Sequence, residues 1–489
     1  MLALLAPLLL TPNLDDDDRD GLEDWLQPEW VDADDDVLLL DGLPAGTLLE
    51  VRGDAASVRL RLGIRSIPLD APWPVPDGAT LALDLGSFSA RAELRFTDAA
   101  GTLVLARRVE AAPLVLPHPL LPVTAVEVAR LDEGADGVSN RALVRAIETR
   151  SPAPVRTRVI EGGRGRWLQD EYEYGVAQGT WSRLDVILGH ERPRGVDPWR
   201  DLHLGPDRAV VGGDWLWLDN ADGYGNLEVT PPLPGHPWGR VLYGITSEGP
   251  PHQALLDLLG QQPQAPTGID TSWLCVGHVD ELVSFVPDPS APRGFRALVP
   301  DPAAGAELLL GLAPDTELPR QASRDALDGR VPRPTVAALQ DDRELWAFNE
   351  RLAAVEQPDL VDRLLDLGVL AEEIVGLPLL FEDSQLDGGG SCGAAPVWPN
   401  PVNLLSVVHG DGDVVFVSDP SMRPADAPIG EDPIAAAIRA ALPRHLRVEW
   451  VDVWDAYHVL GGEVHCATAV QRLDPGARRD PGARRDPGD

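Results

Sequence analysis

Between residues 37 and 108 apolar and polar residues alternate, and this two-residue period constrains the fold more than any other feature of the sequence. Every second residue from Val58 to Ile64 is apolar, and the same holds for 81–85 and 92–96. Successive side chains of a strand point to opposite faces of a sheet, so each series predicts a strand with one buried face. The runs are short, and Gly, Pro and Asp separate them. The pattern predicts a β-sandwich of the Ig type.

The first ten residues, MLALLAPLLL, have the apolar character of a secretory signal. No basic residue precedes them, Pro7 interrupts them, and acidic residues follow without a small-x-small cleavage site. We therefore expect a first strand here and assign residues 1–111 to an N-terminal β-sandwich domain. With no export signal and a free thiol, the expected location is the cytoplasm.

After residue 111 the pattern changes to mixed α and β. A proline-rich stretch at 112–122 predicts a linker. Asp432 is the expected N-cap of a helix that has Pro433 at its first position. Helices are predicted at 140–150, 252–262, 360–368 and 432–442, and strands at 413–419 and 448–453. We assign 112–473 to a second domain and 474–489, which repeats DPGARR, to a disordered tail.

The charge of the chain excludes several functions. Its 489 residues carry 78 acidic and 41 basic side chains, a net charge of -37, and every one of the basic residues is arginine. Without lysine there can be no Schiff-base lysine, pyridoxal anchor or P-loop. Nucleic acid is not an expected partner, because phosphate backbones bind clustered positive charge. No stretch is long enough to span a membrane. A cationic substrate fits the negative charge better.

Cysteine is scarce. Cys275, Cys392 and Cys466 are too few for a disulfide framework in a chain of this length, and they lack the spacing of a zinc site. At least one thiol is therefore expected to be free.

Residues 13–36 form an acidic run with twelve acids and one arginine. Such a run repels itself unless something neutralises it. Part of it, Asp16, Asp18, Asp20, Gly21 and Asp24, has the spacing by which loops wrap oxygen ligands around Ca²⁺. The alternative is a solvated acidic segment, and the spacing alone leaves both open.

Two later segments carry candidate catalytic groups. If 163–175 is a strand, Asp170 lies on one face, and Gln169, Glu171 and Glu173 lie on the other, as oxygen ligands suited to Ca²⁺. In 272–287, His278 and Asp280 stand two apart and would share one face of a strand. Both segments could instead be structural. The first could be an exposed acidic edge strand, and His278 and Asp280 could be a hydrogen-bonded polar pair in the core.

Two further segments add a thiol and more oxygen ligands. Cys466 follows His465 near the end of the second domain; a lone cysteine is more often an inert small hydrophobe than a nucleophile. The turn-rich segment 219–233 contains Glu228 and several free carbonyl groups, which suits a cation.

Taken together, these residues suit the hydrolysis of a planar cation. Two carboxylates, Asp170 and Asp280, could bracket a guanidinium through paired hydrogen bonds, while the thiolate of Cys466 attacks its central carbon. His278 could protonate the departing nitrogen and then deprotonate water. The products would be a urea and ammonia.

The chain resembles the peptidylarginine deiminases, calcium-dependent enzymes that convert arginine in proteins to citrulline. The matching stretches run in the family's order from about 112 to 470. They are WLQDEYEYG, GYGNLEVTPP, SWLCVGHVDELVSFVP, GFRALV, the segment from LLDLG to PLLF, WPNPVNLL and YHVLGGEVHCAT. The resemblance implies a five-bladed α/β propeller (pentein) for the second domain, with Ca²⁺ as cofactor. Arginine-containing proteins or peptides are the implied partners.

The resemblance also implies a role for each matching residue. Cys466 is the implied nucleophile, His278 the general acid and base, and Asp170 and Asp280 the guanidinium clamp. Trp167 would line the arginine stem, and Arg192 and Arg194 would hold the substrate backbone. The implied ligands of a catalytic-domain calcium are Gln169, Glu173, Glu228 and the carbonyl groups of Tyr224 and Leu227. The acidic loop resembles a calcium loop of the family, with Asn13, Asp15, Asp16, Asp18, Asp20 and Asp24 as its ligands.

Three departures from the family pattern limit what carries over. Glu171 matches a ligand of a second catalytic-domain calcium, but Gly189 and Pro193 replace an Asp and an Asn there, so that site is expected to be weak or absent. Leu460 replaces an arginine near the cleft. One Ig-like domain fits before residue 112, where animal members have two.

Two alternatives to a protein-arginine deiminase stay open. One is a guanidine-modifying enzyme that acts on free arginine or agmatine; the Ig-like domain, the calcium ligands and the Arg192/Arg194 pair argue against it. The other is an inactive calcium-binding interaction protein, against which all four catalytic side chains are present. Because the chain is rich in arginine, self-citrullination is a further hypothesis, testable at Arg478, Arg479, Arg484 and Arg485 in the tail.

Overall fold

The computed structural model describes residues 9–10, 36–40, 42–63, 65–131, 138–160, 165–178, 183–189, 208–211, 220–384, 392–410, 412–424 and 427–473. The acidic loop ligands from Asn13 to Asp24, the pair Arg192 and Arg194, Pro193 and the DPGARR tail lie outside these ranges. The predictions that concern them therefore stay predictions.

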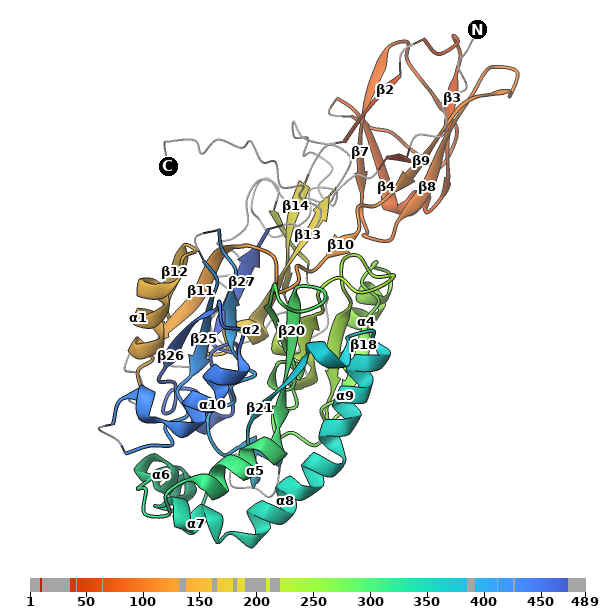
Figure 1. Ribbon diagram of the computed structural model, residues 1–489. Helices are drawn as coiled ribbons and strands as arrows, with labels where there is room; N and C mark the ends of the chain where they lie inside the picture. Colours follow the sequence, from red (N-terminus) through yellow and green to blue (C-terminus); the bar gives the residue numbers. More distant parts are fainter. Residues whose placement is uncertain are drawn as a thin grey trace.

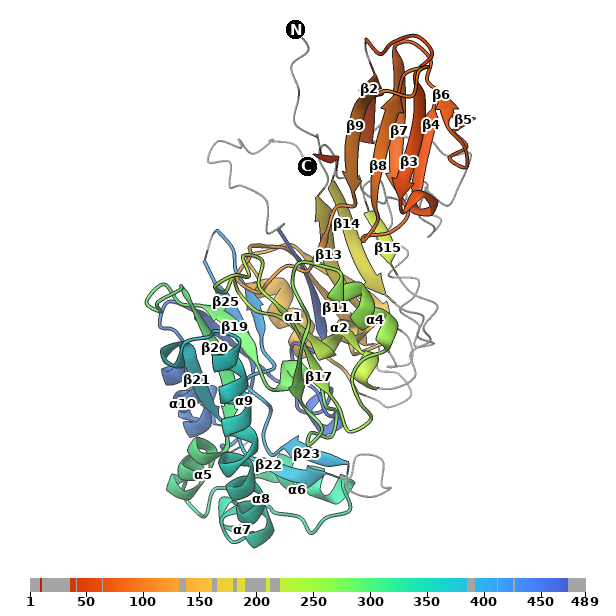
Figure 2. The same ribbon diagram turned by 90° about the vertical axis from the view of Figure 1, so that its right-hand side faces the viewer.

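The N-terminal unit is a β-sandwich at one end of the molecule (Figure 1, Figure 2). One sheet has the order β1-β9-β8-β3-β6 and the other β2-β7-β4-β5. The strands of the first sheet are β1 (Leu9–Leu10), β9 (Leu103–Glu110), β8 (Arg91–Thr97), β3 (Leu48–Gly53) and β6 (Trp73–Pro74). Those of the second are β2 (Asp36–Leu40), β7 (Ala79–Leu85), β4 (Val58–Leu62) and β5 (Arg65–Ser66).

The predicted alternation places this unit's core. Leu81, Leu83 and Leu85 of β7 are buried, as are Leu94 and Phe96 of β8, and together they fill the space between the two sheets. Of the first strand predicted at 1–10, the structure describes Leu9–Leu10, which form β1 and pair in parallel with β9. The Ig-like assignment of this sandwich remains a prediction.

Among its described residues, the second unit has five small sheets with one pairing pattern. In each sheet a central strand pairs antiparallel with one neighbour and parallel with the other. The central strands are β11 (Val123–Leu131), β14 (Arg183–Gly189), β17 (Val241–Ile245), β20 (Phe295–Asp301) and β25 (Val414–Ser418). Their antiparallel neighbours are β27 (Thr468–Arg472), β13 (Tyr172–Gln178), β16 (Leu227–Val229), β19 (Ser284–Pro287) and β24 (Leu405–Val407). Their parallel neighbours are β12 (Val155–Ile160), β15 (Arg208–Val211), β18 (Thr267–Asp270), β21 (Ile374–Pro378) and β26 (Arg447–Val451).

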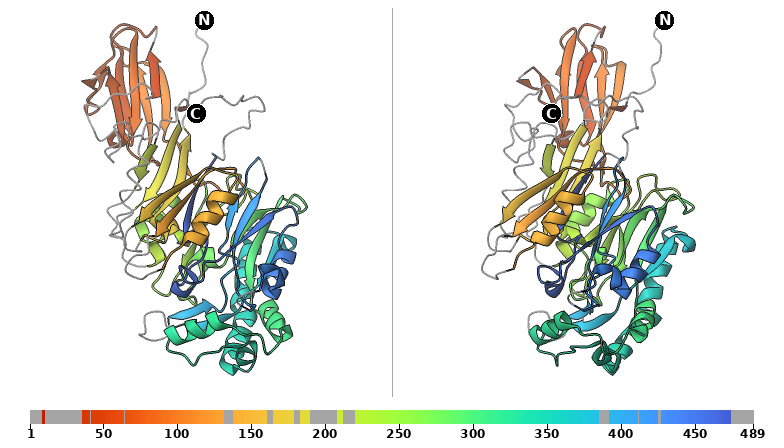
Figure 3. Two further views of the ribbon diagram at one scale, coloured as in Figure 1. Left: turned by 90° about the vertical axis from the view of Figure 1, so that its left-hand side faces the viewer. Right: turned by 60° about the vertical axis from the view of Figure 1, so that its left-hand side comes forward.

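Helices cover the outside of these sheets. The four predicted helices are confirmed as α1 (Arg141–Arg150), α4 (Gln253–Gly260), α9 (Glu356–Asp366) and α10 (Pro433–Ala441). The Asp432 carboxylate accepts the N–H groups of Ile434 and Ala435, as an N-cap should. Helix α1 packs on β11 and β26 at the periphery (Figure 3). The other α-helices of the described ranges are α2 (Leu168–Glu171), α5 (Pro302–Gly311), α6 (Pro319–Leu327), α7 (Val336–Gln340) and α8 (Arg343–Ala354).

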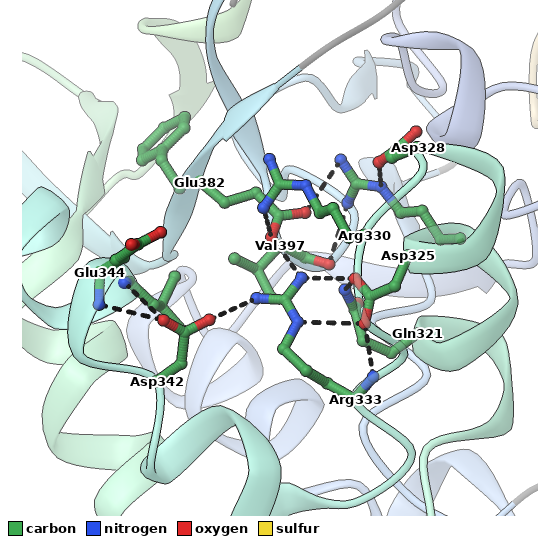
Figure 4. A network of polar contacts seen from close by, with 12 residues as sticks. Gln321, Asp325, Asp328, Arg330, Arg333, Asp342, Glu344, Glu382 and Val397 are labelled. Carbon is green, nitrogen blue, oxygen red and sulfur yellow. Dashed lines mark hydrogen bonds and ion pairs between the residues drawn. The ribbon is translucent and has the colours of Figure 1, made fainter. Parts of the chain in front are cut away.

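A buried ionic network holds α6 and α8 against the hairpin of β22 (Phe381–Ser384) and β23 (Gly393–Pro396) (Figure 4). Arg333 pairs with Asp325 and Glu382, and at 3.1 Å with Asp342. Arg330 reaches Glu382 at 3.0 Å. The guanidinium forks match these carboxylates, so none of the charges is buried alone.

The proline-rich stretch is not a free linker, which corrects the prediction. Its strand β10 (Leu114–Val115) pairs with β13, and Leu114 and Leu116 are buried. Their N–H groups donate to the side chains of Gln262 and Gln264. The two glutamine side chains thus satisfy buried backbone N–H groups of this stretch.

Two of the three cysteines form a disulfide that the sequence did not predict. Cys275 and Cys392 are bonded across 117 residues, whereas Cys466 is free and buried. The expectation of at least one free thiol is confirmed. No helix in the described ranges is long and apolar enough to cross a membrane.

Candidate active site

The free thiol lies in the loop between η8 (His458–Leu460) and β27. Gly461 ends η8 with a φ of 89°, a left-handed conformation that glycine adopts without strain. The Cys466 Sγ lies 3.4 Å from Oδ2 of Asp280, and only 3% of the residue is exposed. The nucleophile proposed from the sequence thus lies beside one of the two proposed clamp carboxylates.

His278 and Asp280 are not on a strand, which corrects the prediction. They belong to the turn of η5 (Val279–Glu281), in which His278 is the N-cap. The Glu281 carboxylate accepts the His278 N–H at 3.0 Å, and this capping interaction favours a helical turn over an extended strand. Nε2 of His278 lies 2.8 Å from the carbonyl oxygen of Asn220, which fixes the ring.

Asp170 is also not on a strand. It lies in the short helix α2, and β13 begins only at Tyr172. The helical turn directs Asp170 toward His278, whose Nδ1 is 3.4 Å from Asp170 Oδ1. At the step from α2 to β13, Gln169 Nε2 donates to Glu173 Oε2 at 2.6 Å.

These side chains converge on the backbone of Gly225, in η4 (Tyr224–Asn226). A Cβ atom at Gly225 would lie 2.7 Å from Asp170 Oδ1, 2.9 Å from His278 Nδ1 and 3.5 Å from Asp280 Oδ2. The second oxygen of Asp280, Oδ1, is buried and accepts no hydrogen bond from the described residues. A carboxylate oxygen left this way is open to a donor from a bound ligand.

The electrostatics of this cluster favour a bound cation. Burial, followed by the charges of Asp280 and Asp170, raises the pKa of the Cys466 thiol well above its usual range. A cation held between the two carboxylates would offset their effect and favour the thiolate.

Trp167 packs against the segment that leads to Cys466. It is half-buried and lies edge-on to Tyr457, with ring centroids 5.5 Å apart. A Cβ at Gly462 would lie 2.4 Å from the indole, so glycine is needed at this contact.

A cavity of about 50 Å³ lies next to the cluster, and most of the predicted calcium ligands line it. Gln169, Glu173, Leu227 and Glu228 line it, together with His465 and Arg472. Tyr224 and Glu171 are buried but do not line it.

The residues around this cavity fit a calcium ion in their chemistry. Burial raises the pKa of both Glu173 and Glu228 to about 7, and a bound cation would relieve the cost of their charges. No three His, Cys, Asp or Glu side chains in the described ranges are grouped to hold a metal. Amide and carbonyl oxygens would therefore have to complete the shell, as they do in many calcium sites.

His465 lies between the Cys466 cluster and this cavity, a position that the sequence did not reveal. Its Nδ1 lies 2.9 Å from Asp280 Oδ2 and its Nε2 3.5 Å from Glu228. Burial alone would lower the pKa of His465, but the hydrogen bond to Asp280 and the charge of Glu228 outweigh it and raise the pKa to about 9. Asp280 and the cavity beside Glu228 thus share one cationic side chain.

A family model described as "Protein-arginine deiminase (PAD)" matches residues 105–475, well over half of the chain. The chain belongs to the protein-arginine deiminase family. Mouse protein-arginine deiminase type-4 is 31% identical over 330 residues, which cover 63% of this chain and 46% of the mouse protein. The human type-1 protein is 30% identical over 331 residues, which cover 64% of this chain and 47% of that protein. The matched part therefore spans about half the length of these relatives.

Among solved structures, an agmatine deiminase of Enterococcus faecalis covers 74% of this chain and 96% of its own. Its identity is 13% and its TM-score 0.43. Within the family-matched region, the structure brings Cys466, His278, Asp170 and Asp280 into one cluster. It also brings to the adjacent cavity two side chains that were not predicted as site residues, His465 and Arg472.

Proposed function

We propose that this chain hydrolyses the guanidinium group of arginine residues in proteins or peptides, producing citrulline and ammonia. The observation that carries the proposal is the convergence of His278, Asp170 and Asp280 on Gly225, with Cys466 against Asp280. Membership of the protein-arginine deiminase family supports it.

Each residue has a distinct role in this reaction. Asp170 and Asp280 accept the guanidinium N–H groups, with Oδ1 of Asp280 as an open acceptor. The positive charge of the bound guanidinium favours the Cys466 thiolate, which attacks the central carbon. His278 donates a proton to the departing nitrogen, and the C–N bond breaks to release ammonia.

The second half of the reaction regenerates the enzyme. His278, now neutral, takes a proton from water as the water attacks the same carbon. The C–S bond breaks, the carbon keeps the oxygen as the ureido group of citrulline, and Cys466 leaves as a thiolate. The balance is one water consumed and one ammonium released for each arginine.

We further propose that the reaction depends on calcium. Gln169, Glu173, Glu228 and the carbonyl oxygen of Leu227 would hold the ion, and Tyr224 would contribute its carbonyl group. The ion would supply positive charge next to α2, which carries Asp170, and next to β16, which follows Gly225 in the chain. Without it, the charges of Glu173 and Glu228 would repel each other, and the positive charges of His465 and Arg472 would offset that repulsion in part.

The architecture proposed from the sequence accompanies this function. The five sheets with one pairing pattern would be the five blades of an α/β propeller over residues 112–473, and the N-terminal sandwich over 1–111 would be Ig-like. Loops at one end of such blades meet at a centre, and this arrangement would bring residues as far apart as Asp170 and Cys466 together.

Citrulline formation on an arginine peptide, on free arginine and on agmatine tests the proposal, each with calcium and with a chelator. We expect the peptide to be the best substrate and the chelator to abolish turnover. A preference for agmatine or free arginine, or activity independent of calcium, would contradict it. Cys466→Ser should remove turnover but keep the thermal unfolding temperature, and residual turnover would exclude Cys466 as the nucleophile.

A further inference from the structure

Asn403 lies against the nucleophile, in the buried loop between β23 and β24. Its Oδ1 is 3.1 Å from the His465 nitrogen and 3.3 Å from the Cys466 nitrogen. Its Nδ2 is 3.2 Å from the Cys466 Sγ and 3.4 Å from the carbonyl oxygen of Asp280. Only 1% of the residue is exposed.

These contacts fix the orientation of the Asn403 amide. Two backbone N–H groups can be accepted only by the amide oxygen, and a carbonyl oxygen can be reached only by the amide nitrogen. The NH₂ group must therefore face the sulfur and donate to it.

The surroundings of the sulfur show why such a donor matters. In the described part of the chain, two side chains form hydrogen bonds with Sγ: the Asn403 amide and the Asp280 carboxylate. A carboxylate destabilises a neighbouring thiolate, whereas an amide N–H stabilises it. Asn403 is thus the side-chain donor at the reacting atom.

We propose that Asn403 is a further catalytic residue, whose amide N–H stabilises the Cys466 thiolate and aims the sulfur at the substrate carbon. This role rests on the proposed function, since it assumes that Cys466 is the nucleophile. The hydrogen bond is strongest to the thiolate, weakens when the C–S bond forms, and is restored when Cys466 leaves again. Asn403 itself exchanges no proton.

Asn403→Asp separates the two roles of the side chain. It keeps an oxygen for the two N–H groups of the loop and replaces the donor to sulfur by a second oxygen. Asn349→Asp is the matched control, because Asn349 is also buried and also joins two segments. Its Nδ2 donates to the carbonyl oxygens of Leu345 and Phe381, and its Oδ1 accepts the Phe381 N–H. Asn403→Ser is a second variant, which shortens the side chain and loses the contact with sulfur without adding charge.

Alkylation of Cys466 by iodoacetamide measures the role directly, and needs no turnover. We expect Asn403→Asp and Asn403→Ser to slow alkylation roughly tenfold or more, and Asn349→Asp to leave it within twofold. The turnover number on an arginine peptide should fall in parallel with the alkylation rate.

Either of two results would overturn the proposal: unchanged alkylation in both Asn403 variants, or an equal loss in Asn349→Asp. The outcome is distinguishable from a failure of the proposed function. A chain without deiminase activity but with slowed alkylation would refute the function and keep the hydrogen bond. Normal deiminase activity with unchanged alkylation would refute the role of Asn403 alone.

Discussion

Loss of the Cys275–Cys392 bond is expected to destabilise the protein and to loosen the turn that leads into His278. Cys275 stands three residues before His278, and Cys392 directly precedes β23 of the β22–β23 hairpin. Two backbone hydrogen bonds run beside the disulfide: Cys275 N–H to the Ala394 carbonyl at 2.9 Å, and Ala394 N–H to the Trp273 carbonyl at 2.8 Å. The bond and the two hydrogen bonds hold the turn against the hairpin.

The magnitude follows from the length of chain that the bond closes. For the separation of 117 residues, the loop-closure relation gives an entropy loss of the unfolded chain of about 16 cal/mol/K, which equals about 4.9 kcal/mol at 25 °C. The two hydrogen bonds beside the disulfide remain after reduction, so the fold should persist. We therefore expect a loss of about 2–5 kcal/mol in the free energy of unfolding.

Guanidinium unfolding in a Cys466→Ser background measures this loss, because the two bonded cysteines are then the only ones in the chain. Reductant should move the midpoint to lower denaturant. The control adds Cys275→Ser and Cys392→Ser, and reductant should not affect it. An unchanged midpoint on reduction, or an equal shift in the control, would refute the reasoning.

The same bond bears on the expected cytoplasmic location. Disulfides are rare in the cytosol of most organisms, where thiols are kept reduced. Labelling of free thiols in protein taken directly from its cells would show whether Cys275 and Cys392 are bonded there. The cytoplasmic location stays a prediction until then.

Two further predictions concern a buried histidine and a glycine of the site. Burial lowers the pKa of His118 to about 4. Between pH 6.5 and 4 the unfolded chain therefore binds a proton that the folded chain does not. As the pH falls through this window, up to about 3 kcal/mol of the free energy of unfolding is lost. His118→Gln should flatten this dependence in urea unfolding at pH 7 and pH 4.5, and parallel losses in both proteins would contradict it. Gly225→Ala should lower turnover about 100-fold at an unchanged unfolding temperature, because the added carbon would meet Asp170 and His278. Gly260→Ala, where nothing lies within 4 Å, is its control, and equal activity in the two variants would count against the assigned site.

Local patterns in the sequence predicted local structure well. The alternation over 81–85 and 92–96 became the buried faces of β7 and β8, and the Asp432-Pro433 pair started α10. These predictions succeed because a period of two, or a cap followed by proline, acts within a few residues of itself. The predicted strands at Asp170 and His278 were wrong. Asp170 lies in the short helix α2, and the capping contact of Glu281 makes a helical turn after His278. Polar residues two positions apart are compatible with a short helical turn as well as with a strand, so their spacing does not distinguish the two.

By itself the sequence determined which chemical groups are present and the family to which the chain belongs. The chain has no lysine, and its motifs contain the Cys466 thiol, the His278 imidazole and the carboxylates of Asp170 and Asp280. Only the tertiary structure decided which of these groups meet. The orientation of the Asn403 amide toward Cys466, the bond between Cys275 and Cys392, and the position of His465 between Asp280 and Glu228 all join segments that are far apart in the chain. Such contacts depend on how sheets from distant parts of the chain pack together, and no periodicity along the sequence records that packing.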